Sequence, residues 1–166
     1  MSLSDLDEVF DGALVWGMEL DPRYRVLAVT LEPTAERYPW GDADDRRVQL
    51  LVHPVSTVLA SFRSVEDGRR LLHTFTDAQL VDVAGAFGGA AVAAPLFGRP
   101  EPRPGEWSPQ FSMEGRSSAA DGTRHTLTVQ LRADDLELDL FARFDEVEVK
   151  GPDGTNLDLD ARRASD

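Results

Sequence analysis

The chain has 166 residues, 42% of them hydrophobic, and a formal net charge of −13. This length suits a single domain, and this hydrophobic content suits a buried core rather than a disordered chain. The lack of cysteine excludes disulfides, thiolate nucleophiles, iron–sulfur clusters and cysteine-based zinc sites. The negative charge argues against nucleic acid or an anionic membrane as a partner.

The charged residues are biased in composition. Lysine occurs once, at Lys150, isoleucine is absent, and arginine carries nearly all of the positive charge. The bias fits a GC-rich bacterial coding sequence, and a halophilic surface is the alternative explanation. No apolar run reaches the roughly 18–20 residues of a membrane span, and the acidic N-terminus is unlike a secretory signal. These features predict a soluble, cytoplasmic protein.

The first predicted element is a short helix or arm over residues 1–11. Hydrophobic residues from Leu3 to Phe10 recur at helical spacing, with Ser4 as the N-cap. Strand-forming residues then predict a hairpin over 13–31 that turns at "DPR". Within its first strand we expect Trp16 to lie in the core.

Three further strands are predicted after the polar loop "PTAERYPWGDADD". The first, "RRVQLLVHP", alternates in polarity and breaks at His53–Pro54. The second begins after this break and forms a hairpin with "RRLLHTF" through a turn at Asp67–Gly68.

One helix is expected near 77–87. Thr76 and Gln79 match a capping box, apolar residues then recur on one face, and Gly88–Gly89 would end the helix. A strand through "LVDVAGAF" is the alternative. The following "RPEPRPGEWSP" predicts a stiff connector, because its first prolines lie two apart rather than in the PxxP spacing of a recognition motif.

The last third of the chain predicts a series of strands before a disordered tail at 161–166. The predicted fold class is therefore mainly β with minor α: antiparallel sheets packed as a sandwich or split barrel, in one domain over 12–160. Similar patterns at 13–62 and 110–150 also suggest a weak two-fold repeat, which one internal match does not establish.

Six carboxylates crowd the stretch "LELDLFARFDEVEVKGPDG", residues 136–154. Leu136 to Phe144 alternate with Glu137 and Asp139, and the alternation changes phase near Phe144, which predicts a bulge or corner. We interpret the carboxylates as the solvated face of a sheet, since nothing in their spacing forces them to converge on a metal ion.

No motif predicts catalysis, a metal site or a cofactor. His53, His73 and His125 lie at no zinc-ligand spacing, and His73 fits a half-buried strand position. The sequence has no GxSxG or SxxK pattern, and "GAFGGA" comes at a helix end rather than at a helix start.

Loop aromatics provide the candidate binding residues Tyr38, Trp40 and Trp107, and His53 at a predicted strand end is a further candidate. The alternative is that each tryptophan caps the end of a sheet core. Exposed tryptophans often mark binding sites because they bury a large area and keep a polar N–H. We therefore expect a non-enzymatic acidic protein-interaction module whose partner is a basic protein or a second copy of the chain. The alternative is a small-molecule binder or enzyme with a pocket inside or between the sheets.

Overall fold

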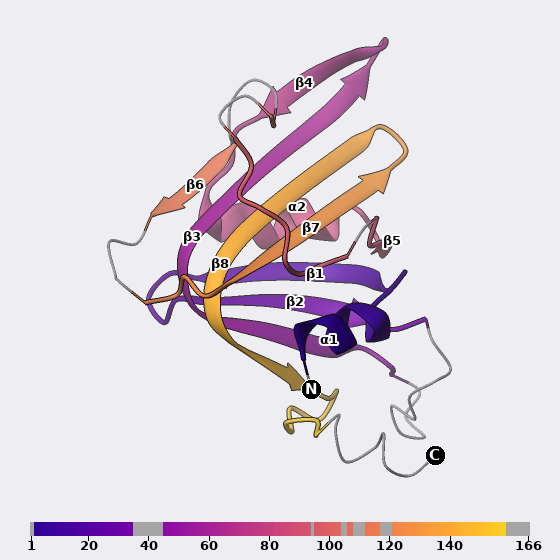
Figure 1. Ribbon diagram of the computed structural model, residues 1–166. Helices are drawn as coiled ribbons and strands as arrows, with labels where there is room; N and C mark the ends of the chain where they lie inside the picture. Colours follow the sequence, from indigo (N-terminus) through magenta and orange to yellow (C-terminus); the bar gives the residue numbers. More distant parts are fainter. Residues whose placement is uncertain are drawn as a thin grey trace.

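An antiparallel sheet of eight strands dominates the computed structural model, accompanied by two short helices (Figure 1). The structure describes residues 2–34, 45–93, 95–103, 106–107, 112–116 and 121–158. The strands are β1 (Leu14–Asp21), β2 (Val26–Glu32), β3 (Val48–Glu66), β4 (Arg69–His73), β5 (Ala90–Ala91), β6 (Met113–Arg116), β7 (His125–Ala133) and β8 (Leu136–Lys150). The predicted fold class is confirmed.

Both predicted hairpins form. In the β1–β2 turn, Asp21 Oδ1 accepts hydrogen bonds from the amides of Arg23 and Tyr24 at 2.9 and 3.1 Å, a local closure typical of aspartate in turns. The β3–β4 turn places Asp67 and Gly68 at φ 50° and 74°. Two consecutive positive φ values are what a two-residue turn needs to match the twist of its strands.

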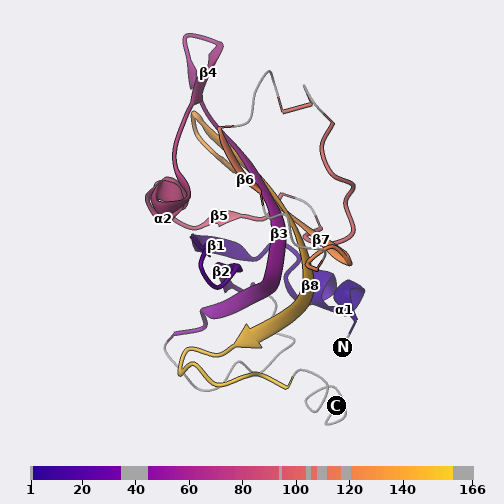
Figure 2. The ribbon, with the colours of Figure 1, turned by 90° about the vertical axis from the view of Figure 1, so that its left-hand side faces the viewer.

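The predicted separation of two strands at His53–Pro54 is wrong. β3 is one strand of 19 residues that bends there, and β8 bends beside it (Figure 2). Ser56 is an extra residue in the pairing, because Val55 faces Phe144 while Thr57 faces Arg143. A bulge of this kind lets a strand turn without losing its partner.

The bend gives β3 different neighbours along its length. Its first half pairs with β2 on one edge, whereas on the same edge its second half pairs with β6 and β4. β8 follows the other edge throughout. The sheet therefore folds over into two halves that share β3 and β8.

Residues 90–93 and 95–98 nearly close the folded sheet into a barrel. β5 pairs with β1, and the Val92 amide donates to the Ala13 carbonyl at 2.9 Å. Farther along, the Leu96 carbonyl accepts from the Thr128 amide of β7 at 2.6 Å. The hydrophobic side chains of both halves form one core inside, to which Val15, Leu50, Leu80, Leu127 and Leu140 belong.

Both helices bury hydrophobic residues in this core. α1 (Leu3–Val9) buries Leu6 and Val9. Its N-cap is Ser2 rather than the predicted Ser4, because Asp5, three residues after Ser2, completes a capping box. α2 (Leu80–Gly85) follows a 3-10 turn, η1 (Asp77–Gln79), which begins at the predicted Thr76–Gln79 box. The helix near 77–87 is thus confirmed.

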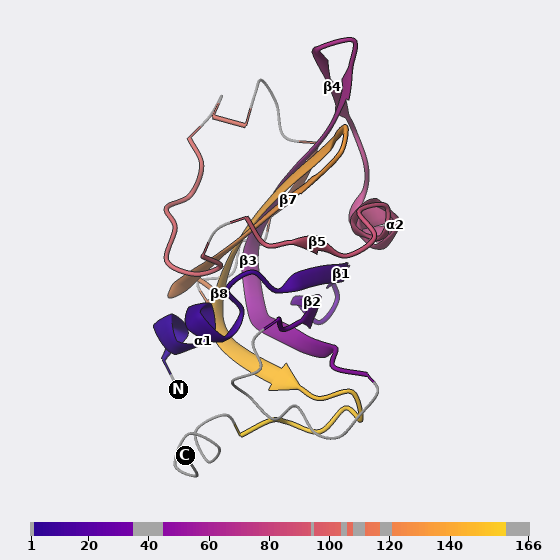
Figure 3. The ribbon, with the colours of Figure 1, turned by 90° about the vertical axis from the view of Figure 1, so that its right-hand side faces the viewer.

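Different segments cover the two sides of the upper half of the sheet, in which β3 pairs with β6 and β4. α2 lies on one side of this half, where it packs against β1, and the segment 95–103 runs along the opposite side (Figures 2 and 3). The tail 161–166 lies outside the described residues. The domain boundaries and the repeat of 13–62 in 110–150 stay predictions.

Candidate binding site around Trp16

Trp16 lies at the surface, not in the core as its sequence position predicts. The pairing of β1 with β2 shifts between Val15 and Gly17, so that Trp16 is an extra residue. Val15 and Met18 are both buried, whereas Trp16 is 39% exposed. A strand of strict alternation could not bury positions 15 and 18 together. The bulge does this by turning the indole outward.

The indole ring of Trp16 is held from two sides. Its Nε1–H donates a hydrogen bond of 2.6 Å to Oε2 of Glu32 on β2. The ring also lies over Gly89, where an added Cβ would stand 3.0 Å from two of its carbon atoms. Gly89 has φ +89°, so this position combines a left-handed backbone with space for the ring. The aromatic surface is therefore both accessible and fixed in position.

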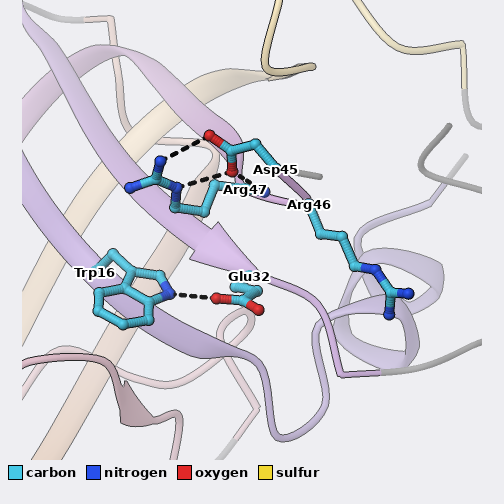
Figure 4. Close-up of a pocket in the computed structure, with 5 residues that line it drawn as sticks. All are labelled: Trp16, Glu32, Asp45, Arg46 and Arg47. Carbon is cyan, nitrogen blue, oxygen red and sulfur yellow. Dashed lines mark hydrogen bonds and ion pairs between the residues drawn. The ribbon is translucent and has the colours of Figure 1, made fainter. Parts of the chain in front are cut away.

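An open pocket of about 520 Å³ adjoins the ring, lined by Trp16, Glu32, Asp45, Arg46 and Arg47 (Figure 4). Asp45 binds Arg47 through both of its oxygens, which accept from Nε at 2.8 Å and from Nη2 at 2.7 Å. These hydrogen bonds from Arg47 lower the pKa of Asp45 to about 2. The two residues form a neutral pair.

The charged group of Glu32 lies close to the indole ring, whereas that of Arg46 does not. The side chain of Arg46 extends away from Trp16, whereas Glu32 lies at the edge of the indole (Figure 4). Within the described ranges Glu32 has no ion pair within contact distance. The charge nearest the ring is therefore negative, and it also acts electrostatically on Arg47.

Of the candidates taken from the sequence, His53 and Trp107 are described, and neither lines this pocket. His53 lies on β3, half-buried, with Nε2 3.1 Å from Oε1 of Glu148. Trp107 is partly buried in the connector between β5 and β6. Tyr38 and Trp40 lie outside the described residues. The signal that could have indicated Trp16 is the three-residue spacing of Val15 and Met18, which breaks the period of two.

The other two histidines, His73 and His125, contact neighbouring side chains of the fold. His73 Nε2 lies 2.7 Å from the Ser64 hydroxyl, and its ring centroid lies 5.3 Å from that of Phe62. The half-buried position predicted for His73 is confirmed. His125 is exposed and packs beside Phe144 at 5.6 Å. In the part of the chain that the structure describes, no group of histidine and carboxylate side chains could bind a metal ion.

The prediction of a fully solvated carboxylate face on β8 is wrong for Glu137 and Asp139. Asp139 is 2% exposed and forms ion pairs with Arg63 and with Arg132, the latter at 2.7 Å. Glu137 pairs with Arg63 at 3.2 Å and with Arg70 at 3.1 Å. Glu146, by contrast, is exposed as expected.

The segment 95–103 reaches the surroundings of Asp139 through Gln130. Its Arg99 donates to Gln130 Oε1 at 2.9 Å, and Gln130 in turn donates to Asp139 at 3.1 Å. Glu101 of the same segment pairs with Arg143 at 2.8 Å. A face of the sheet that alternation assigns to solvent is thus covered by a connector. Because arginine guanidinium groups form ion pairs with both Glu137 and Asp139, the cluster is a structural ion-pair network.

No protein-family model, curated protein or solved structure matches this chain. Among the described residues, no helix combines the length and apolar character needed to cross a membrane.

Proposed function

We propose that this chain is a non-enzymatic protein-interaction module that binds a basic partner through the surface around Trp16. The observation that carries the proposal is the outward-facing, immobilised indole whose N–H donates to the Glu32 carboxylate, a carboxylate with no ion pair in contact among the described residues. Tryptophans held in this way supply large contact areas at little cost in conformational entropy. The net charge of −13 would attract a basic protein and accelerate its association.

The packing of the interior favours this function over the small-molecule alternative. The buried hydrophobic residues of both sheet halves form one cluster, and the described pocket beside Trp16 opens to solvent, which supports a surface interaction. A cytoplasmic location and a bacterial source are further expectations from the composition.

The test is capture of partners from a lysate of the source organism, with the intact chain, Trp16→Ala and Glu146→Gln as parallel baits. Glu146→Gln is the matched surface control, since Glu146 is exposed and outside the pocket. We expect a near-stoichiometric basic protein that salt releases, retained by Glu146→Gln and lost with Trp16→Ala.

Capture that is equal on all three baits would overturn the assignment to this surface. Recovery of the chain alone would replace the basic partner by self-association, which sedimentation of the purified protein would measure directly. Circular dichroism of each bait checks that the substitution leaves the fold intact.

A further inference from the structure

The electronic state of the Trp16 ring identifies the chemical group that the pocket recognises. The face of an indole is the negative end of its quadrupole and attracts cations more strongly than the faces of tyrosine or phenylalanine. In this structure Nε1–H donates to a carboxylate at 2.6 Å. A strong hydrogen bond to an anion polarises the donor and so increases the electron density of the ring. Glu32 therefore makes the exposed indole face a better acceptor of positive charge.

The charges of the lining residues indicate the same preference. Asp45 and Arg47 compensate each other, and the Arg46 side chain extends away from Trp16. Glu32 uses Oε2 for the indole, and no hydrogen bond to its Oε1 is found in the described part of the chain. A cation stacked on the ring would thus meet both a π face and a free carboxylate oxygen. An anion in the same place would face the Glu32 charge.

We infer, on the basis of the proposed function, that the group bound here is the guanidinium of a partner arginine, stacked on Trp16 and donating to Glu32. A guanidinium is planar, so it can lie parallel to the indole while its in-plane N–H groups reach a carboxylate at the ring edge. A lysine ammonium is more strongly hydrated and lacks this flat shape. In a pocket open to water, the weaker hydration of the guanidinium favours arginine.

The experiment is an NMR titration that follows the indole N–H signal of Trp16. The signal is assigned with Trp16→Phe, which separates it from the signals of Trp40 and Trp107. The probes are four short blocked peptides, acetyl-Gly-X-Gly-amide, in which X is arginine, citrulline, lysine or glutamate. Citrulline is the matched control, because it has nearly the shape of arginine without its charge.

We expect a saturable shift with the arginine peptide and binding about tenfold weaker with citrulline. Lysine should bind more weakly than arginine, and glutamate should leave the signal unchanged. Glu32→Gln should weaken arginine binding, whereas Glu146→Gln, which removes the same charge outside the pocket, should leave it unchanged. Added salt should weaken arginine binding.

Equal shifts with citrulline and arginine would overturn the inference, as would binding of lysine as tight as that of arginine. Binding of glutamate that Arg46→Gln abolishes would instead identify an anion site. The capture experiment and the titration test different claims. If a partner is captured only when Trp16 is present and the titration is negative, the proposed function stands. The inference that the bound group is a guanidinium is then wrong.

Discussion

Asp139 is the residue whose surroundings differ most from what its neighbours in the chain suggest. Its place between Leu138 and Leu140 assigns it to the solvent side of β8, yet its carboxylate is buried between two arginines. A buried carboxylate is tolerated only when its charge is compensated and its oxygens accept hydrogen bonds. Arg63, Arg132 and Gln130 provide these partners.

We expect Asp139→Ala to lower the free energy of unfolding by about 3–5 kcal/mol, because it leaves the buried guanidinium of Arg63 without its closest counter-ion. Urea denaturation measures the change. The double variant Glu146→Gln/Glu148→Gln is the control, and its loss should stay below about 1 kcal/mol. If Asp139→Ala were as mild as this control, the network would not contribute to stability.

Gly122 is a second position at which the surrounding structure restricts the choice of amino acid. Its φ is +79°, and an added Cβ would overlap the carbonyl oxygen of Pro54 and lie 3.0 Å from the Ser56 amide. Gly154 has the same φ of +79° but nothing within 4 Å. The two glycines therefore separate the cost of a left-handed backbone from the cost of a steric overlap.

Gly122→Ala should lose about 3 kcal/mol or more of stability, whereas Gly154→Ala should lose about 1 kcal/mol through backbone strain alone. Thermal and urea unfolding of the two variants give the comparison. Equal losses would mean that the approach of residue 122 to the corner of β3 is not a tight packing contact.

At the scale of elements, the side chain of Asp7 attaches α1 to the segment that closes the barrel. Asp7 Oδ1 accepts hydrogen bonds from the amides of Leu96 and Phe97 at 2.7 and 3.1 Å. Burial raises the pKa of Asp7, and the two amides lower it by less. Its charge is thus a net cost of the fold at neutral pH, while its oxygen satisfies two donors.

Asp7→Ala should cost about 2 kcal/mol, because two amides lose their acceptor, and Asp7→Asn should cost less because it keeps an oxygen. The pH dependence has a defined sign. Since the folded pKa lies above 3.8, the folded state takes up the proton first, and the intact chain gains stability as the pH falls through that pKa. The difference in unfolding free energy, Asp7→Asn minus the intact chain, should therefore decrease as the pH falls. A constant difference would contradict the raised pKa.

Prediction of the elements succeeded where it depended on nearby residues and failed where a bulge changed the strand. The hairpin turns and the Thr76–Gln79 cap depend on residues close in the chain, and they were predictable for that reason. The outward turn of Trp16 and the continuous bend of β3 depend on pairing with β2 and β8. Pairing partners lie far along the chain, so the local pattern only marks such places as breaks in alternation.

At the scale of the whole molecule, the net charge of −13 lowers the stability of the compact folded state. Like charges repel more strongly in the folded state than in the expanded chain, and salt screens this repulsion. We expect the melting temperature at pH 7 to rise by a few degrees between about 0.01 M and about 0.15 M sodium chloride. Near pH 4.5, the isoelectric point of the sequence, the rise should largely disappear. A fall of the melting temperature with salt at pH 7 would show that attractive ion pairs such as Arg63–Asp139 outweigh the repulsion.

The sequence by itself determined the class of the fold, the acidity and the local turns, because alternation, capping and turn chemistry act over a few residues. It also placed Leu138, Leu140 and Phe144 on the core side of β8. Only the tertiary structure decided that Trp16 faces outward beside Glu32, while Asp139 is buried under a connector. The physical reason is common to both: whether a side chain meets water depends on what the distant parts of the chain place over it, and alternation along one strand contains no information about that cover.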